Sequence, residues 1–546
     1  MAATTWDTGF APEDDCDLTL STDVLVIGGG PAAAWAAWSA ATSGAKVVVV
    51  DKGYLGSSGA AAASGNGVLT VPPAERPEVL IQRYRQGNGL GNPRWIERVL
   101  ECTWQSMPLL DEWGYKFPRE NGEPVRKSFY GPEYMRVMRR RLLALGVRIL
   151  DQSPALELLV DQDGVVAGAR GLQRQENSRY NVRAGAVVLA TGGCSFLSKA
   201  LGCNVNTGDA CLMAVEAGAE LSSMEFSAQY AISSAINATA TRGVPYAWAT
   251  YTDADGNDLG GIEGGRRRDD FLATALLKGP VFARFDKATP DIKAVIEKSH
   301  FIAFLPLRKA GIDPYTQRFP VTLVLEGTVR GVGGVRLTSD DCAASVPGLY
   351  AAGDAATREF LAGAASGGGG PNAAWAISSG RWAGAGAARF ALASRSDTSD
   401  RPLRATGQVG LRQAEGKQKF DSDTIIKGVQ DELFPLDKNY FRTGAGLTTS
   451  LQKLDSLWRE VRGNPRLEDP RSIERSRTAA ALVAAGRWTY RAGLERRETR
   501  SLNRRTDFPH TDSAQRHYQV TGGLDEIWIR REPVENIPDY SHSAVA

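Results

Sequence analysis

Residues 22 to 53 read TDVLVIGGGPAAAWAAWSAATSGAKVVVVDKG, and this stretch indicates the fold class of the chain. Residues 23 to 27 are an apolar, β-rich run typical of a buried parallel strand, and residues 32 to 43 favour a helix that ends at Gly44. Residues 47 to 50 predict a second buried strand. A strand, a helix and a further strand in this order predict an α/β fold with a parallel sheet.

The turn between the first strand and the helix has the composition of a phosphate-binding turn. Gly28 permits a tight turn, Gly30 lets the backbone approach a pyrophosphate, and Ala33 keeps the third position small so that helix and strand pack. The helix N-terminus then faces the phosphates. Asp51 closes the second strand 21 residues after Gly30, where a carboxylate accepts hydrogen bonds from a ribose 2′-hydroxyl. The pattern favours a dinucleotide whose adenosine carries no 2′-phosphate.

Two later strands return to this nucleotide-binding core. Residues 184 to 194, AGAVVLATGGC, and residues 345 to 356, SVPGLYAAGDAA, are apolar runs that lead into glycines. Both resemble the flavin motifs of two-dinucleotide-type flavoproteins, which implies FAD as the cofactor and a contact between Asp354 and its ribitol chain. A nicotinamide dehydrogenase would not need such a late return, whereas a flavoprotein with an inserted domain does.

Six further segments occur in the order found in one known family. From about residue 20 to about residue 510 the chain resembles the flavoproteins of fumarate reductase, succinate dehydrogenase and L-aspartate oxidase. The segments that carry the resemblance are TGDACLMAVEAGAELSSMEF (207 to 226), TRGVPYAWATYTDADGNDL (241 to 259), GRRRDDFLATALL (265 to 277), GIDPYTQRFPV (311 to 321), GVGGVRL (331 to 337) and ETRSLNRRTDFP (498 to 509).

The resemblance implies a Rossmann-type, two-dinucleotide-binding FAD domain in two parts, residues 18–221 and 329–395. An α+β capping domain that holds the substrate, residues 222–328, is inserted between them. A C-terminal helical domain and tail, residues 405–546, follows, and apolar residues at helical intervals support its helices directly. The polar segment 393 to 408 predicts an exposed linker.

The same resemblance implies a set of FAD contacts. In the resembling respiratory subunits a histidine links covalently to FAD, and Ser58 occupies about that place here, so noncovalent FAD is expected. The run SGGGGPN, residues 366 to 372, is expected to approach the flavin with backbone amides, although a flexible loop is the alternative. The predicted FAD-binding residues are Gly28, Gly30, Pro31, Ala32, Ala33, Asp51, Lys52, Ser57, Ser58, Gly59, Ala63, Ser64, Gly65, Ala155, Thr191, Gly192, Asp209, Gly353, Asp354, Ser366, Gly370 and Asn372.

The resemblance also implies an arginine that acts as the acid toward a substrate carbon, and the motif match places it at Arg268. Because arginine has a pKa above about 12, this role needs a neighbouring carboxylate and a dry site. A solvated Arg-rich turn is the alternative. Other substrate positions depart from the family. Tyr230 replaces a histidine, Thr241 is retained, and Arg242 replaces a glutamate.

The carboxylate-clamping arginine of the family has no equivalent in LAGAASGGGGPNAAWA, residues 361 to 376. An arginine fork supplies both charge and geometry to a carboxylate, so the sequence does not predict fumarate reduction. It predicts an FAD-dependent oxidoreductase that transfers hydride between flavin and a small organic anion, through a diverged dicarboxylate site. Its candidate catalytic residues are Tyr230, Thr241, Arg242 and Arg268.

Two alternatives stay open. The chain also resembles the flavoprotein subunit of adenylylsulfate reductase, in SSGAAAASGNG and in DEWGYKFPRENGE, residues 111 to 123. This resemblance implies electron transfer to a separate ferredoxin-like iron–sulfur partner. The missing histidines of the substrate site suggest, alternatively, an FAD-binding redox sensor without catalysis.

Composition limits the other partners. A formal net charge of +2 gives no field that attracts nucleic acid. The six cysteines contain no CxxC pair and only four histidines are present, so no metal site is predicted. The first twenty residues lack the pattern of a secretory signal, and no apolar stretch predicts membrane insertion, so a cytoplasmic location is expected. A homodimer is compatible with the sequence.

Overall fold

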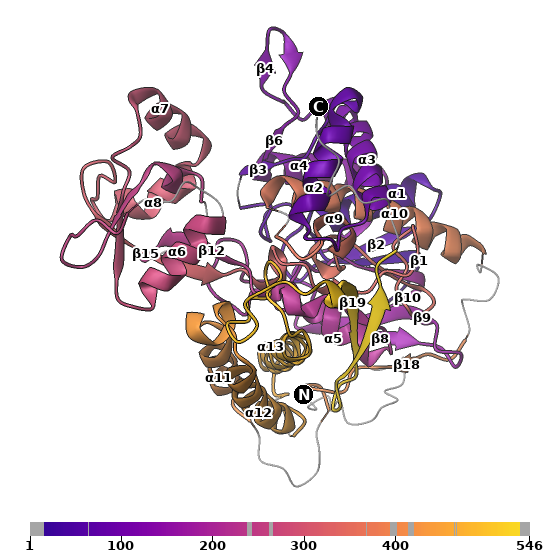
Figure 1. Cartoon of the computed structure of the whole chain (residues 1–546). Coiled ribbons are helices and arrows are strands. Elements are labelled where there is room, and N and C mark those ends of the chain that lie inside the picture. The colour runs from indigo at the N-terminus through magenta and orange to yellow at the C-terminus, as the bar shows by residue number, and fades with distance from the viewer. Residues whose placement is uncertain are drawn as a thin grey trace.

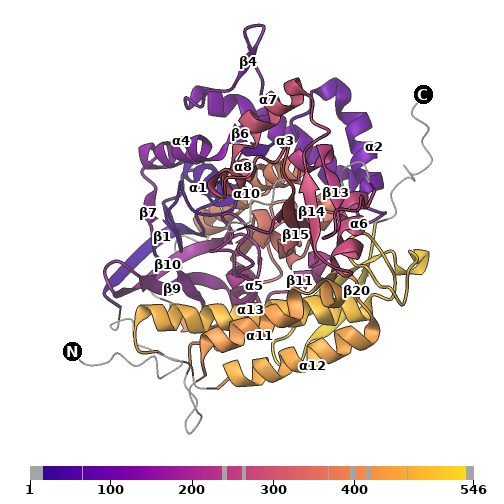
Figure 2. The same cartoon turned by 90° about the vertical axis from the view of Figure 1, so that its left-hand side faces the viewer.

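The computed structural model describes residues 16–63, 65–236, 243–260, 266–366, 368–393, 401–412, 420–463, 465 and 467–535. Figure 1 shows a large α/β body, a smaller body at its left that contains α6, α7 and α8, and the helices α11, α12 and α13 below. In Figure 2 the smaller body faces the viewer, and α11, α12 and α13 run along the lower side of the molecule.

The α/β body is built on an eight-stranded sheet with the order β18-β8-β9-β10-β1-β2-β7, in which β17 also pairs with β10. Strand β1 is parallel to both neighbours, and Val24 lies opposite Ala186 of β10 and Val47 of β2. The strands are β1 (Leu18–Ile27), β2 (Val47–Val50), β7 (Arg148–Leu150), β8 (Ala155–Val160), β9 (Val166–Gln173), β10 (Ser178–Leu189), β17 (Leu349–Ala351) and β18 (Arg404–Ala405).

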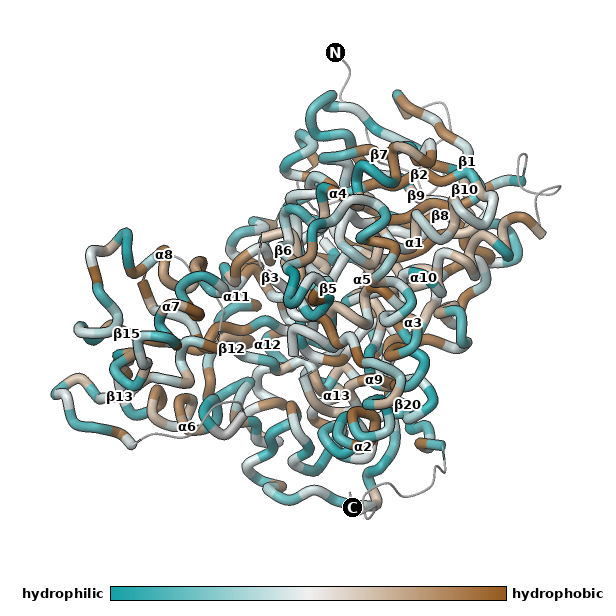
Figure 3. The backbone as a smooth tube through the Cα atoms, turned by 90° about the horizontal axis from the view of Figure 1, so that it is seen from above, coloured by the Kyte–Doolittle hydropathy of each residue, from teal (hydrophilic) through white to brown (hydrophobic). Residues whose placement is uncertain are grey.

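The predicted strand–helix–strand unit is confirmed: α1 (Pro31–Thr42) connects β1 to β2. The second half of β1, Val24 to Ile27, is buried on both faces, as expected for a parallel strand covered by helices. Figure 3 shows hydrophobic positions concentrated in β1, β2 and β10. The helices of this body are α1, α2 (Arg76–Gln86), α3 (Pro93–Glu112), α4 (Gly131–Ala144), α5 (Asp209–Glu216), α9 (Glu359–Ala362) and α10 (Gly369–Ala393).

Helix α10 packs along α1 at very short range. A Cβ at Gly380 would lie 2.5 Å from the Ala32 carbonyl oxygen, and a Cβ at Gly384 would lie 2.2 Å from that of Ala36. Both glycines are therefore required for this contact. Residues from Gly369 onward already belong to α10, so most of the glycine-rich run predicted near the flavin is the first turn of a helix.

A four-stranded antiparallel sheet with the order β12-β15-β14-β13 forms the smaller body. We call this sheet and its three helices the cap. Its strands are β12 (Tyr230–Ser234), β13 (Thr250–Thr252), β14 (Val281–Arg284) and β15 (Phe319–Leu325), and its helices are α6 (Arg266–Leu276), α7 (Pro290–Ser299) and α8 (Phe301–Lys309). The described part of the cap lies within the predicted capping domain.

The C-terminal region contains α11 (Ser422–Leu433), the π-helical turn η8 (Leu436–Tyr440), α12 (Gly444–Val461) and α13 (Pro470–Glu495). Beyond these helices, β19 (His517–Gly522) and β20 (Trp528–Pro533) join β11 (Leu221–Ser222) and β16 (Gly334–Val335) in a third sheet, which the sequence does not predict. The predicted linker also contributes β18, which pairs with β8 at the edge of the main sheet.

Two small sheets complete the fold. Strand β3 (Gly65–Gly67) pairs with β6 (Ser128–Tyr130), and β4 (Arg119–Glu120) pairs with β5 (Glu123–Pro124) in the hairpin that projects at the top of Figure 1. Among the helices of the described ranges, none combines the length and hydropathy needed to span a membrane.

Candidate functional site

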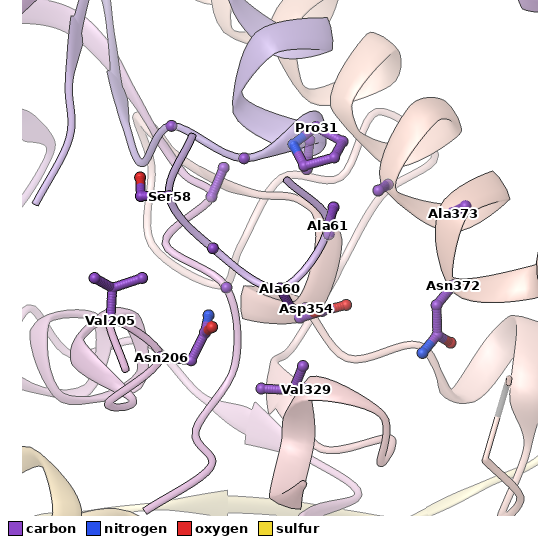
Figure 4. Close-up of a pocket in the computed structure, with 18 of the residues that line it drawn as sticks. Pro31, Ser58, Ala60, Ala61, Val205, Asn206, Val329, Asp354, Asn372 and Ala373 are labelled. Atoms are coloured by element: carbon purple, nitrogen blue, oxygen red, sulfur yellow. The ribbon is translucent and has the colours of Figure 1, made fainter. Parts of the chain in front are cut away.

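A cavity lies where β1, β10 and β17 end and where α1 and α10 begin. Stretches of chain far apart in sequence supply its walls, and Figure 4 shows side chains from several of them around one open space. The lining residues are Gly29, Gly30, Pro31, Ala32, Asp51, Ser58, Gly59, Ala60, Ala61, Gly65, Gly67, Phe129, Tyr134, Ala190, Thr191, Gly192, Val205, Asn206, Val329, Arg330, Gly353, Asp354, Gly369, Asn372, Ala373 and Ala376.

Glycines open the walls of this cavity to a ligand. A Cβ at Gly30, Gly59 or Gly369 would meet no other atom within 4 Å, so the backbone at these positions faces empty space. Gly30 is the N-cap of α1, and it makes no side-chain capping bond to the helix amides. Gly369 begins α10. Two helix N-termini thus begin at the cavity with their positive dipole ends, which favour a pyrophosphate or another anionic group.

The turn after β1 is fixed by backbone geometry. Gly28 has a φ of +127°, and a Cβ there would lie 2.2 Å from the carbonyl oxygen of Ala190. Only glycine therefore allows β1 and β10 to end side by side at the cavity. Ala33 does not line the cavity; it is fully buried in α1, as expected for a small packing residue.

Asp51 ends β2 with its carboxylate against the turn. The Ser58 hydroxyl donates a 2.9 Å hydrogen bond to Asp51 Oδ2, and a Cβ at Gly29 would lie 2.3 Å from the same oxygen. Burial raises the pKa of Asp51, while the bond from Ser58 acts in the opposite direction. The carboxyl is thus held in a desolvated position, where a ribose hydroxyl is a suitable partner.

Asp354 lies at the opposite wall, after β17. Arg358 Nη1 donates to Asp354 Oδ1 at 2.5 Å, and Arg358 is 1% exposed. Burial raises the pKa of Asp354 and the Arg358 charge lowers it. Arg330 also lines the cavity, with its Nε 3.5 Å from Glu326 Oε1.

Two amide side chains provide a test of whether the cavity fits FAD. Asn206 and Asn372 both line it, and each has a buried Oδ1 atom without a hydrogen-bond partner. Figure 4 shows their amide groups on the cavity side of the chain. A buried polar atom without a partner is costly, and the hydroxyl, amide and imide groups of FAD would satisfy these two. The lining therefore fits FAD in its polar groups, its glycine openings and its helix ends.

Twelve of the predicted FAD-binding residues meet at this cavity. They are Gly30, Pro31, Ala32, Asp51, Ser58, Gly59, Gly65, Thr191, Gly192, Gly353, Asp354 and Asn372. Ser64 lies outside the described residues. The remaining nine do not line it, and they are Gly28, Ala33, Lys52, Ser57, Ala63, Ala155, Asp209, Ser366 and Gly370.

Several of the nine have other partners. Lys52 Nζ donates to Thr207 and, at 3.1 Å, to Asp209 Oδ2. The predicted residues Lys52 and Asp209 therefore contact each other and do not line the cavity. Ser366 donates a 3.0 Å bond to the carbonyl oxygen of Arg330 and so holds a lining residue from behind. Ala155 is the first residue of β8.

Several lining side chains lie outside the set that the sequence predicts. Phe129 stacks on Tyr134 with ring centroids 4.2 Å apart, and the Tyr134 hydroxyl accepts a 2.7 Å bond from the indole of Trp35. Phe129 lies in β6 and Tyr134 in α4, so both lining aromatic residues are outside every glycine motif. Asn206 was also missed, although it lies beside Gly192, whose Cβ would clash with its amide at 2.0 Å.

Arg268 lies in the first turn of α6 and is 6% exposed. Its Nε and Nη2 donate to Asp269 Oδ1 at 3.2 and 3.0 Å, and its Nη1 donates to the Gly243 carbonyl at 2.8 Å. Burial raises the pKa of Asp269, opposed by the charge of Arg268. A solvated Arg-rich turn therefore does not describe Arg268, which is desolvated and paired with a carboxylate.

The other candidate catalytic residues are placed differently. The Tyr230 hydroxyl donates to the Leu433 carbonyl at 2.7 Å, and the residue is 2% exposed. Tyr230 is thus committed to packing against α11, and neither Tyr230 nor Arg268 is among the residues that line the cavity. Thr241 and Arg242 lie outside the described residues.

These features define an FAD-binding flavoprotein of the α/β class. The chain matches the family described as FAD binding domain over residues 23–371, well over half its length, and it belongs to this family.

Curated relatives agree with this assignment. L-aspartate oxidase of Streptomyces coelicolor is 27% identical, with 62% of this chain and 63% of that protein covered. The chain thus spans less than two thirds of that relative. The fumarate reductase flavoprotein subunit of Mycobacterium tuberculosis is 24% identical, with 91% and 93% covered.

Solved structures share the fold. E. coli quinol fumarate reductase gives a TM-score of 0.80 at 19% identity, with 95% of this chain and 98% of that chain covered. Adenylylsulfate reductase from Archaeoglobus fulgidus gives a TM-score of 0.74 at 18% identity, with 99% of both chains covered. The predicted resemblance to fumarate reductase and succinate dehydrogenase flavoproteins, and FAD as the cofactor, are confirmed.

Proposed function

We propose that this FAD-dependent oxidoreductase acts on a small organic anion and that Arg268 exchanges the proton on the substrate carbon next to the one that exchanges hydride, accepting it when the flavin is reduced and donating it in the reverse direction. When bound, FAD supplies the acceptance and return of hydride. The chain supplies the rest: Gly30 and the start of α1 bind phosphate, Asp51 orients the adenosine ribose, and the aromatic residues Phe129 and Tyr134 exclude water from one wall.

The observation that carries this proposal is the environment of Arg268. Arg268 is 6% exposed, and its guanidinium forms an ion pair with Asp269. These are the surroundings that an arginine acid requires. In a dry site such a cation also attracts a carboxylate or a similar anion more strongly than in water. Because the family's carboxylate clamp is absent from residues 361 to 376, we do not propose fumarate as the substrate.

We further propose that FAD is held without a covalent bond. Among the lining residues of the described chain there is no histidine or cysteine, and Ser58 occupies the place where the covalent link is expected. Acid precipitation of the purified protein should therefore release a yellow supernatant. Retention of the colour in the pellet would contradict noncovalent binding.

The test of the catalytic proposal is anaerobic bleaching of the bound flavin by candidate acids. We expect Arg268→Gln to lower the bleaching rate at least about 100-fold, a loss typical of removing one transition-state contact or proton donor, while FAD content is unchanged. Arg268→Lys should retain part of the rate. Arg308→Gln is the matched control, because Arg308 is an exposed cap arginine paired with Glu297. A near-normal rate in Arg268→Gln would exclude Arg268 as the acid.

A second candidate function is that of a flavoprotein subunit that passes electrons to a separate ferredoxin-like iron–sulfur protein. The fold match to adenylylsulfate reductase over 99% of both chains favours it. Turnover of the pure chain with oxygen or a soluble dye would support a self-contained enzyme. Bound FAD that no acid bleaches, and that a reduced ferredoxin does reduce, would support the subunit. If neither reagent changed the bound flavin, a non-catalytic FAD-binding sensor would remain.

A further inference from the structure

The cap contacts the C-terminal region through a small group of residues that the FAD site does not use. This group consists of the Leu433 carbonyl at the end of α11, Tyr440 at the end of η8, and Arg504, and we call it the clasp. In Figure 1 the cap lies at the left of the molecule, above α11.

The clasp contacts the cap first through β12. The Tyr230 hydroxyl donates to the Leu433 carbonyl at 2.7 Å, and the Tyr230 and Tyr440 rings pack edge-on with centroids 5.4 Å apart. Tyr230 begins β12, the strand through which the chain enters the cap sheet. One edge of the cap is thereby fixed to the end of α11.

The second contact is made to α6. Asp270 Oδ1 accepts a 2.6 Å bond from the Tyr440 hydroxyl and a 2.9 Å bond from Arg504 Nε. The Arg504 guanidinium also lies 3.9 Å from the centre of the Tyr440 ring, a cation–π distance. The backbone amide of Arg442 donates to the Arg504 carbonyl at 2.9 Å, so the two clasp side chains are held at a fixed separation.

Asp270 is two residues from Arg268 in the same helical turn. The guanidinium of Arg268 has little freedom of its own, because its Nη1 donates a 2.8 Å hydrogen bond to the Gly243 carbonyl and its Nη2 donates a 3.0 Å bond to Asp269 Oδ1. Its position therefore follows the position of the helix start. Since Asp269 pairs with Arg268 and Asp270 pairs with the clasp, consecutive carboxylates connect the proposed acid to the C-terminal region.

We propose that Tyr440 and Arg504 are positioning residues, which hold the start of α6 so that the guanidinium of Arg268 stays desolvated and correctly placed. The proposal rests on the role of Arg268 given under Proposed function. Neither clasp side chain lines the FAD cavity, so FAD binding should not depend on them. The clasp in the C-terminal region therefore aligns Arg268 for the substrate anion, whereas other parts of the chain bind the flavin.

The experiment uses the full-length FAD-loaded protein and the variants Tyr440→Phe, Arg504→Gln, Arg504→Lys and Asp270→Asn. Reaction of Arg268 with phenylglyoxal, quantified by mass spectrometry, reports directly on its desolvation. We expect about a five-fold or greater increase in Arg268 modification for Arg504→Gln and Asp270→Asn, and partial rescue by Arg504→Lys. Tyr440→Phe should give a smaller increase, because the ring that contacts Arg504 and Tyr230 remains.

Amide hydrogen exchange measured on the same samples separates a local from a global effect. Exchange should rise in residues 268–276 and stay at the wild-type level in β1 and β10. Arg308→Gln, which removes an ion pair within the cap, should change neither readout at Arg268. Unchanged Arg268 reactivity in Arg504→Gln, or a uniform rise of exchange in the main sheet, would overturn the proposal.

Neither readout needs a substrate, so the outcome is separable from that of the catalytic proposal. One outcome is that the clasp variants expose Arg268 while the flavin of Arg268→Gln is still bleached at the normal rate. In that case the clasp positions the arginine, and the arginine is not the acid. If Arg268→Gln abolishes bleaching while the clasp variants leave Arg268 protected, the acid is correct and the clasp is not its support.

Discussion

Glu359 in α9 is a carboxyl group buried far from solvent, with 2% of its surface exposed. The hydroxyl groups of Ser222 and Ser223 donate to its Oε2 at 2.6 and 2.5 Å. Burial raises its pKa to about 7, and the two serines only partly oppose this. The folded state therefore binds a proton at pH values where the unfolded chain, with a glutamate pKa of about 4.3, does not.

A raised pKa makes this site stabilising at low pH. Its contribution is fully present below the unfolded pKa and is lost as the pH rises through about 7. We expect Glu359→Gln, which resembles the protonated form, to gain stability relative to the wild type between pH 5 and pH 8. The gain should be up to about 3 kcal/mol. Denaturant titrations of both proteins at the two pH values measure it, and a pH-independent difference would contradict the assigned pKa.

Residue-scale prediction from the sequence was uneven for a physical reason. Gly28, Gly30 and Asp51 follow a local pattern in which backbone conformation and one side chain suffice, and the structure brings them together as expected. The family resemblance implies that Tyr230 contacts the substrate, but the Tyr230 hydroxyl donates its hydrogen bond to the Leu433 carbonyl. A hydrogen bond between residues about two hundred positions apart leaves no local trace in the sequence.

At the scale of elements, the contact between α1 and α10 couples packing to the FAD site, because both helices begin at the cavity. We expect Gly384→Ala to destabilise the fold by about 1 to 3 kcal/mol, the usual range for overpacking, since its Cβ would lie 2.2 Å from the Ala36 carbonyl oxygen. Separation of the helices should also reduce FAD retention on gel filtration.

The control for this prediction is Gly279→Ala. A Cβ at Gly279 would meet no other atom within 4 Å, and the residue is partly exposed. It should therefore leave both stability and FAD retention near the wild-type level. Equal FAD loss in the two variants would show that the α1–α10 spacing does not control the site.

Element prediction succeeded where the hydrophobic period is strong and failed where pairing is distant. The β1–α1–β2 unit and the long helices α12 and α13 follow clear apolar patterns. Strand β19 pairs with the two-residue strand β11, about three hundred positions earlier. So short a partner gives no periodic signal, and the C-terminal sheet was therefore not predicted.

For the whole molecule, the candidate FAD cavity takes its lining from chain that precedes the cap and from chain that follows it. A ligand that binds only the folded state stabilises it by about 2.7 kcal/mol at a hundred times its Kd. We expect apoprotein prepared by mild acid and salt to melt several degrees below the holoprotein, and added FAD to restore the Tm in a concentration-dependent manner. Identical melting of both forms would contradict a cavity that needs the cofactor to satisfy Asn206 and Asn372.

The sequence predicts the glycines and acidic residues of the site. It does not predict the aromatic residues that line one wall. Glycine motifs reveal themselves because few residues tolerate their backbone geometry. Phe129 and Tyr134 resemble ordinary core residues in sequence, and only the pairing of β3 with β6 brings them to the cavity. The same limit applies to the clasp, whose members lie about 170 to 230 positions after the cap residues that they contact.

The pairing of β1 with β10 has a consequence for synthesis on the ribosome. β1 is complete at Ile27, but its parallel partner ends at Leu189, and the last wall of the cavity comes from α10. Chains grow at about 5 to 20 residues per second. Strand β1 is therefore synthesised several seconds before its neighbour β10. The vitamin-derived cofactor has no complete binding site until translation has passed residue 376. Nascent chains therefore spend most of their elongation without it and in need of protection from aggregation.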